Sequence, residues 1–170
     1  MSAISDGETL IQNYLDSDDT QQMLIALKKL KIKFKIEKKD ILIKGSNHNF
    51  LNKSAKLFLG NAGTAFRPLT AVLAIMGGEY YLEGIDRMHE RPIKDLVDSL
   101  TQIGAKIDYI GDPGYPPLKI SPGNIICNKN IKIKGSVSSQ YLTALLIAGP
   151  LCNQDLKIQK LTSNRYFFLK

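Results

Sequence analysis

The sequence predicts an α/β fold made of repeated units, because the same pattern of helix and strand recurs at a fixed distance along the chain. The segments MLIALKKLKIKF (23–34) and LVDSLTQIGAKI (96–107) each contain an amphipathic helix, a break and a short strand, 73 residues apart. The same offset relates LTAVLAIMGG from Leu69 to LTALLIAGP from Leu142. Two segments that share one long period indicate a duplicated subdomain and not a solenoid.

The middle unit has the best-marked boundaries. Gly77 and Gly78 end its first helix, Pro92 suits the first turn of its second helix, and Gly104 ends that helix. The segments GDPGYPP (111–117) and SPGN (121–124) have the composition of turns. We therefore expect a helix at 64–76, a strand at 79–84, a helix at 92–103, a strand at 105–110, and further strands near 117–120 and 131–134.

Parts of two more units flank the middle one. The segment 8–19 has the pattern of a strand from an earlier unit, and a helix at 137–149 with a strand at 155–161 begins a later unit. The expected division is about 1–60, 61–134 and 135–170, all within one partial domain. Because both ends of the chain fall inside a unit, we expect a fragment of a longer protein.

Composition favours a soluble globular protein, with 44% hydrophobic and 23% charged residues. No apolar run approaches the ~20 residues of a membrane span, and the N-terminus lacks the pattern of a secretory signal. Cys127 and Cys152 lie 25 positions apart with no CxxC pair, which argues against a zinc site or a disulfide framework. These features favour a reduced, cytoplasmic setting.

The net charge of +7 comes in large part from KKLKIKFKIEKK at 28–39. One interpretation is a patch that binds nucleic acid or a membrane. The alternation of Ile32, Phe34 and Ile36 favours another, in which a solvated helix end runs into a strand. Aromatic interleaving of the kind that stacks bases is missing from this segment. We expect an anionic small-molecule partner, with no nucleic acid and no membrane.

Two turns rich in glycine and polar side chains precede equivalent helices, GNAGTAFR in the middle unit and KGSVSSQ in the next. Unpaired N–H groups and the positive end of the helix dipole at such a start bind phosphate or carboxylate. The alternative is ordinary N-capping by Thr64 or Ser138. Because equivalent turns of a repeat end on the same side of a symmetric fold, the pair favours a shared anion site.

Arginine is scarce in this chain, with four residues against 19 lysines, yet Arg67, Arg87 and Arg91 fall in or near these turns. The planar fork of arginine holds a carboxylate or phosphate bidentately, which lysine cannot do. Arg91 precedes Pro92 and is therefore expected in extended backbone at a helix start. The alternative role of Arg91 is a structural salt bridge to Glu90, Glu83 or Asp95.

The motifs LFLGNAGTAFRPLTAVLA, RMHERPIKDLVDSLTQIGAKIDY, YPPLKI and GSVSSQYLTALLIAGPL, in this order, resemble the 5-enolpyruvylshikimate-3-phosphate synthase family. LDSDDTQQMLIALKKL is similar to an earlier segment of that family. The resemblance implies a two-domain enzyme whose domains each contain three βαβαββ units, with helix N-termini directed at the cleft between them. This chain would supply most of the N-terminal domain.

The resemblance also implies an activity, that of a 3-phosphoshikimate 1-carboxyvinyltransferase. The enolpyruvyl group of phosphoenolpyruvate would pass to the 5-hydroxyl of shikimate 3-phosphate through a tetrahedral intermediate, with release of phosphate. This step belongs to the shikimate pathway to chorismate and the aromatic amino acids. No metal or organic cofactor would take part, and the full-length enzyme would be a cytoplasmic monomer.

Site residues follow from the resemblance, position by position. Phosphoenolpyruvate would be bound by Asn61, Gly63, Thr64, Arg91 and Gln140. Shikimate 3-phosphate would be bound by Ser138, Ser139, Gln140, Ser163 and Tyr166. Arg67 would organise the phosphoenolpyruvate loop, and Asp18 would support the site from the LDSDD turn. No residue of this fragment is assigned as catalytic, and no metal ligand is expected.

The sequence departs from the family in several places. The PGSKS-type segment would lie ahead of Met1, and the acid and base groups of the C-terminal domain would lie beyond the chain, so we expect no turnover by this fragment. Ser163 lies in SNRY where the family usually has Ser-Lys-Pro-Tyr, and Phe66 replaces the commoner Met. Two other functions stay open, a UDP-N-acetylglucosamine enolpyruvyl transferase and a non-catalytic anion-binding module.

Overall fold

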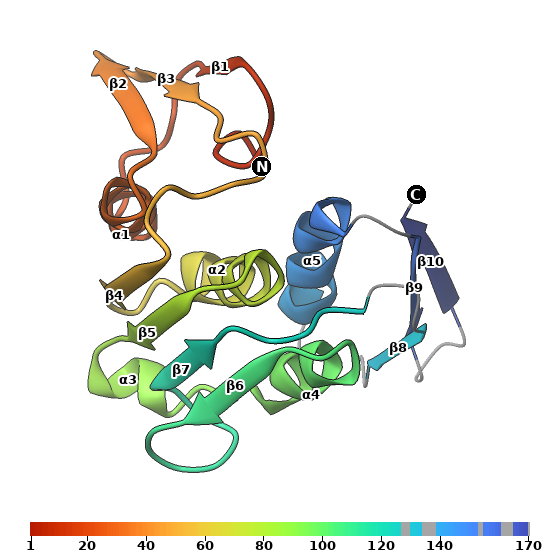
Figure 1. Cartoon of the computed structure of the whole chain (residues 1–170). Helices are drawn as coiled ribbons and strands as arrows, with labels where there is room; N and C mark the ends of the chain where they lie inside the picture. The colour runs from red at the N-terminus through yellow and green to blue at the C-terminus, as the bar shows by residue number, and fades with distance from the viewer. Residues whose placement is uncertain (127–129, 134–138, 153–154, 161–164, 170) are drawn as a thin grey trace.

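The computed structural model describes residues 1–126, 130–133, 139–152, 155–160 and 165–169, and Figure 1 shows their arrangement. Three small β-sheets surround a pair of helices, α2 and α5, which pack against each other. In chain order the elements are β1 (Glu8–Ile11), α1 (Asp18–Lys29), β2 (Lys33–Glu37), β3 (Asp40–Lys44), β4 (Ser54–Phe58), α2 (Gly63–Met76), β5 (Glu79–Glu83), α3 (Asp86–His89), α4 (Lys94–Gln102), β6 (Lys106–Tyr109), β7 (Leu118–Ser121), β8 (Asn130–Ile133), α5 (Ser139–Ala148), η1 (Gly149–Leu151), β9 (Leu156–Lys160) and β10 (Arg165–Leu169).

The sheets repeat one topology. The second sheet has the order β4-β5-β7-β6, in which β4 and β5 are parallel and the other pairs are antiparallel. The first sheet, β1-β3-β2, repeats its last three strands, with α1 in the place of α4. The third sheet, β10-β9-β8, repeats its parallel start, because α5 connects the parallel strands β8 and β9 as α2 connects β4 and β5.

Hydrogen bonds at equivalent positions support the 73-residue repeat. In α2 the hydroxyl of Thr70 donates to the carbonyl of Phe66 at 2.8 Å. In α5 the hydroxyl of Thr143 donates to the carbonyl of Ser139 at 3.1 Å. Both the donor and the acceptor are displaced by the same 73 positions, so the two helices are local copies as well as topological ones.

The predicted elements of the middle unit are confirmed, with one difference. The helix expected at 92–103 begins later, at Lys94, and the turn before it contains the short helix α3, which the sequence pattern did not predict. Sheet membership also groups β4 with the second sheet and β8 with the third. The sheets therefore divide the chain before Ser54 and before Asn130, whereas the predicted units begin at the helices, near residues 61 and 135.

The lysine-rich segment 28–39 covers the last turn of α1 and the strand β2, as the solvated-strand interpretation predicts. Ile32 is buried and Phe34 is half-buried, but Ile36 is 43% exposed because β2 is the outer strand of its sheet. The prediction of no disulfide is wrong at Cys152, which is disulfide-bonded. The other cysteine, Cys127, lies outside the described residues.

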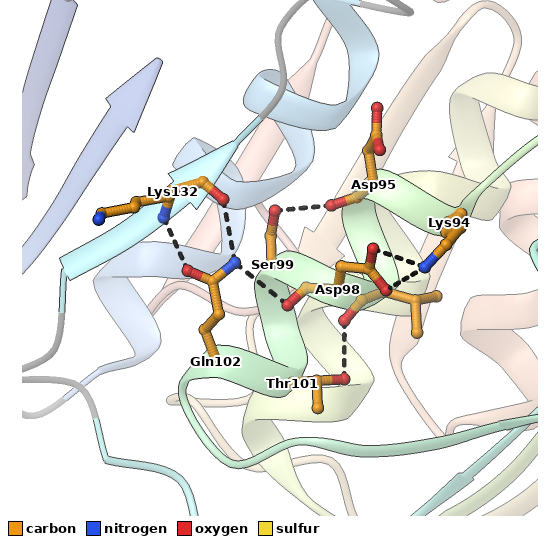
Figure 2. Close-up of polar contacts among 8 residues, drawn as sticks. Lys94, Asp95, Asp98, Ser99, Thr101, Gln102 and Lys132 are labelled. Carbon is orange, nitrogen blue, oxygen red and sulfur yellow. Dashed lines mark hydrogen bonds and ion pairs between the residues drawn. The ribbon is translucent and has the colours of Figure 1, made fainter. Parts of the chain in front are cut away.

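Side chains at the end of α4 fasten this helix to β8 (Figure 2). The Gln102 amide nitrogen donates to the carbonyl of Lys132 at 3.0 Å, and the Lys132 N–H donates to the Gln102 amide oxygen at 2.9 Å. One side chain thus pairs with a strand residue in the way a neighbouring strand would. In the first unit, 73 positions earlier, the Lys29 ammonium donates to the carbonyl of Lys56 on β4 at 2.8 Å.

The centre of the fold is α2, in which ten of 14 residues are buried. A helix that is buried on nearly all sides has to be apolar on all sides, and Leu69, Val72 and Leu73 satisfy this requirement. The charged exception is Arg67, which is only 5% exposed. No described helix is long and apolar enough to cross a membrane.

Candidate functional site

The N-terminus of α2 has no side-chain cap, since the preceding residue is Ala62. The hydroxyl of Thr64 donates to the carboxylate of Asp19 in the first turn of α1. The capping role considered for Thr64 is therefore wrong. Gly63, Ala65 and Phe66 donate their N–H groups to nearby backbone carbonyls. Within the described part of the chain the Thr64 N–H has no acceptor, so the helix start offers one donor to a ligand.

Two guanidinium groups meet at Gly63. A Cβ atom placed on this glycine would lie 2.5 Å from Nη1 of Arg67, 2.9 Å from Nη1 of Arg91 and 3.0 Å from Nη2 of Arg91. All three distances are shorter than a van der Waals contact of about 3.5 Å. The structure therefore requires glycine here so that both cations can approach the backbone.

Arg91 is half-buried and is held by an amide residue. Its Nη1 donates to the carbonyl of Asn61 at 3.1 Å and to the side-chain oxygen of Asn61 at 3.3 Å. Among the described residues no carboxylate lies within ion-pair distance of Arg91. The alternative of a structural salt bridge is therefore wrong within this part of the chain; it is Arg87 that pairs with Glu90, at 3.8 Å.

Arg67 is the buried member of the pair. Its Nη1 donates to the carbonyl of Gly63 at 3.3 Å and its Nη2 to the carbonyl of Pro92 at 3.5 Å, while Nε has no partner among the described residues. Burial lowers the pKa of the Arg67 guanidinium, and the neighbouring charge of Arg91 lowers it further. A buried cation without a counter-ion is costly, so two adjacent cations make this point of the fold a place where an anion is stabilised.

The first turn of α5 contacts the segment that contains Arg91 and Pro92. Tyr141 is 1% exposed, its hydroxyl donates to the carbonyl of Pro92, and the Arg67 guanidinium lies 5.8 Å from the centre of its ring. Ser139 is exposed and Gln140 is half-buried at the helix start. Tyr141 of α5 and Arg67 of α2 therefore donate to one carbonyl, that of Pro92.

The remaining predicted site residues lie elsewhere or outside the described residues. Ser138 and Ser163 are not among the described residues. Tyr166 lies on β10, where its hydroxyl accepts from the amide of Gln159 at 2.9 Å and Lys157 lies over its ring. Asp18 is exposed, and it is the next residue, Asp19, that reaches the site through Thr64.

The sequence interpretation missed Asp19 and Tyr141. The LDSDD turn contained the signal for Asp19, because a helix start carries both aspartates and only the geometry distinguishes them. Tyr141 gave no sequence signal beyond its place after GSVSSQ. Among the described residues no group of three His, Cys, Asp or Glu side chains could hold a metal ion.

A cavity of about 580 Å³ lies away from this site. It is lined by the segments 6–8, 31–33 and 44–51, at the opposite end of α1 from Asp19. At the arginine pair, Arg67 is buried and Arg91 is half-buried.

Known proteins similar to this chain share its fold and its sequence. The sequence pattern of the family described as EPSP synthase (3-phosphoshikimate 1-carboxyvinyltransferase) matches residues 1–166. The chain is 54% identical over 155 residues to the 3-phosphoshikimate 1-carboxyvinyltransferase of Cupriavidus necator, and 54% identical over 155 residues to that of Paraburkholderia phytofirmans. Each alignment covers 91% of this chain and 36% of the relative, so the chain spans about a third of the length of these relatives.

A solved structure shows the same fold. The EPSP synthase of Acinetobacter baumannii matches 96% of this chain and 37% of its own chain, with a TM-score of 0.83 and 24% sequence identity. The α/β fold predicted from the repeat is thereby confirmed. On the match that spans nearly its whole length, this chain belongs to the EPSP synthase (3-phosphoshikimate 1-carboxyvinyltransferase) family.

Proposed function

We propose that this chain forms one wall of the substrate site of a 3-phosphoshikimate 1-carboxyvinyltransferase. The enzyme transfers the enolpyruvyl group of phosphoenolpyruvate to the 5-hydroxyl of shikimate 3-phosphate and releases phosphate. The observation that supports this role is the pair of guanidinium groups at Gly63, with no carboxylate paired to either one in the described structure. Both substrates are anions, and this pair is built for an anion.

Phosphoenolpyruvate would bind at the start of α2. Its carboxylate or phosphate would take the fork of Arg91, which Asn61 orients, and the N–H of Thr64 would supply a further donor. Gly63 would allow the ligand and both arginines to approach the backbone. The charge of Arg67 would raise the positive potential at the site, while its Nη1 and Nη2 atoms remain hydrogen-bonded to the carbonyls of Gly63 and Pro92.

Shikimate 3-phosphate would bind at the start of α5. The hydroxyls of Ser138 and Ser139 would hold it, and Gln140 would lie between the two substrates. Ser163 and Tyr166 would complete the acceptor site. The bonds of Tyr141 and Arg67 to the Pro92 carbonyl support this arrangement, because they hold the start of α5 near the start of α2, where the two substrates would bind.

The groups that move protons would come from the other domain of the enzyme. Transfer of an enolpyruvyl group needs an acid and a base held against both substrates, and no described residue at the arginine pair is placed for that role. We expect the 170-residue chain to bind phosphoenolpyruvate weakly and to release no phosphate from the mixture of both substrates. Measurable turnover by the isolated chain would contradict this assignment.

Binding itself can be tested by titrating the chain with phosphoenolpyruvate and following its amide signals by NMR. The signals of Gly63 and Thr64 should shift, and Arg91→Lys should weaken binding about tenfold, because lysine keeps the charge but loses the fork. Arg87→Lys is the matched control, since Arg87 makes an exposed ion pair with Glu90. Equal affinities of the two variants would refute the role of Arg91.

A further inference from the structure

Tyr141 occupies a position that joins three elements of the site. It belongs to α5, its side chain is buried, and its hydroxyl donates to the carbonyl of Pro92. The same carbonyl accepts from Nη2 of Arg67, a residue of α2, at 3.5 Å. Pro92 directly follows Arg91 in the chain, so one oxygen atom ties both helices to the backbone that carries the second arginine.

The carbonyl is the one backbone group through which Pro92 can be held. Proline has no N–H to donate, and the Pro92 side chain is exposed. The neighbours of Pro92 are held by segments other than α5, because the Arg91 N–H donates to the carbonyl of Met88 at 3.1 Å and the Ile93 N–H donates to the carbonyl of Gly114 at 2.8 Å. Among the hydrogen bonds of the described residues, the bond from Tyr141 connects this segment to α5.

The ring of Tyr141 also contacts the guanidinium group of Arg67. The guanidinium lies 5.8 Å from the ring centre, which is within the range of a cation–π contact. A phenylalanine in this place would keep that contact and the packing of the ring. Only the hydroxyl reaches the Pro92 carbonyl, so its contribution can be separated from that of the ring.

We propose that Tyr141 is a positioning residue that fixes Arg91 and Arg67 for the donor anion through its hydrogen bond to the Pro92 carbonyl. The proposal rests on the proposed function only for the identity of that anion, phosphoenolpyruvate. Its consequence is that α5, whose first residues Ser139 and Gln140 would hold the acceptor substrate, also sets the geometry of the donor site.

The test compares Tyr141→Phe with Tyr80→Phe in the 170-residue chain. Tyr80 is a matched control, because it is also 1% exposed and its hydroxyl also donates to a backbone carbonyl, that of Asn52 at 3.2 Å. The first measurement uses the chain without ligand. The side-chain NMR signals of Arg67 and Arg91 should shift in Tyr141→Phe and stay in place in Tyr80→Phe.

The second measurement is the affinity for each substrate. Loss of one neutral hydrogen bond corresponds to about a three- to tenfold change, so Tyr141→Phe should weaken phosphoenolpyruvate binding by that factor and leave shikimate 3-phosphate binding unchanged. A general loss of structure would weaken both ligands alike, and that result would overturn the proposal. Arginine signals that stay in place in Tyr141→Phe would also overturn it, whether or not either ligand binds.

The two measurements keep the proposals apart. One outcome is that the chain binds no phosphoenolpyruvate, while the arginine signals shift in Tyr141→Phe and not in Tyr80→Phe. This outcome would refute the proposed function and leave the positioning role supported. A chain that binds phosphoenolpyruvate with equal affinity before and after Tyr141→Phe would refute the positioning role and leave the proposed function in place.

Discussion

Replacing Gly63 with alanine should separate the stability of the fold from the binding of the anion. The new Cβ would lie 2.5 Å from Nη1 of Arg67 and 2.9 and 3.0 Å from the two terminal nitrogens of Arg91. To restore contacts of about 3.5 Å, Arg91 would have to retreat by roughly half an ångström and Arg67 by about 1 Å. Arg67 is buried and bound to two carbonyls, which resist its retreat, whereas Arg91 is half-buried and can move toward solvent.

The expected loss follows from the contacts of Arg91. Its bonds to Asn61 are 3.1 and 3.3 Å long, so a retreat of this size takes both beyond hydrogen-bonding distance. A hydrogen bond to a charged group is worth about 1.5–3 kcal/mol, which corresponds to roughly 10- to 100-fold in affinity. The backbone gains instead, because Gly63 does not have the left-handed conformation and alanine favours a helix by up to ~1 kcal/mol.

The assay combines thermal unfolding with NMR titration of phosphoenolpyruvate. Gly63→Ala should keep the melting temperature within a few degrees of the parent chain and weaken binding at least tenfold. Gly111→Ala is the matched control, since the nearest atom to its new Cβ would be 3.6 Å away in Pro117 and its backbone is not left-handed. Unchanged affinity in Gly63→Ala would refute the argument that glycine serves the arginine pair.

Two further changes test the packing of the fold. Gln102→Ala removes both hydrogen bonds to Lys132 and should lower the free energy of unfolding by about 1–3 kcal/mol; Lys94→Ala, which removes only the exposed ion pair with Asp98, should lower it by less than about 1 kcal/mol in the same urea titration. Burial, and then the charges of Asp98 and Asp95, raise the pKa of Tyr109 to about 12, above its usual 10, and its hydroxyl has no partner among the described residues. The protonated form of Tyr109 is therefore favoured in the folded state. The stability that this preference contributes to the fold is fully present below pH 10 and is lost as the pH rises toward 12. Urea titrations between pH 9 and pH 11.5 should show that the free energy of unfolding falls less in Tyr109→Phe than in the parent chain. If it falls equally in both, Tyr109 is not the cause of the pH dependence.

The sequence was sufficient for the elements that a repeat and punctuating residues define. Gly77 and Pro92 mark a helix end and a helix start whichever neighbours surround them, because their backbone restrictions are local. The short helix α3 (Asp86–His89) was not predicted, since four residues are too few for an apolar period to be visible. The assignment of β4 to the second sheet needed the pairing of Ala55 with Tyr80, which is a long-range property.

The sequence was sufficient to predict which residue types gather at the site, but not which contacts each of them makes. The concentration of arginine near two glycine-rich turns was visible in the sequence, and the structure brings the guanidinium groups of Arg67 and Arg91 together at Gly63. The sequence could not show that the Thr64 hydroxyl donates to Asp19, because those residues are 45 positions apart. Nor could it show that Tyr141 and Arg67 share the carbonyl of Pro92, which depends on how α2, α5 and the start of α4 pack.

Because Arg67 and Arg91 have no carboxylate partner among the described residues, the stability of the folded chain should depend on the anions in its buffer. An anion that binds between the two arginines stabilises the native state and not the unfolded chain, where the guanidinium groups are dispersed and hydrated. At a free concentration 100 times the dissociation constant, this linkage adds about 2.7 kcal/mol to the free energy of unfolding. The melting temperature should therefore rise with phosphate or sulfate at constant ionic strength.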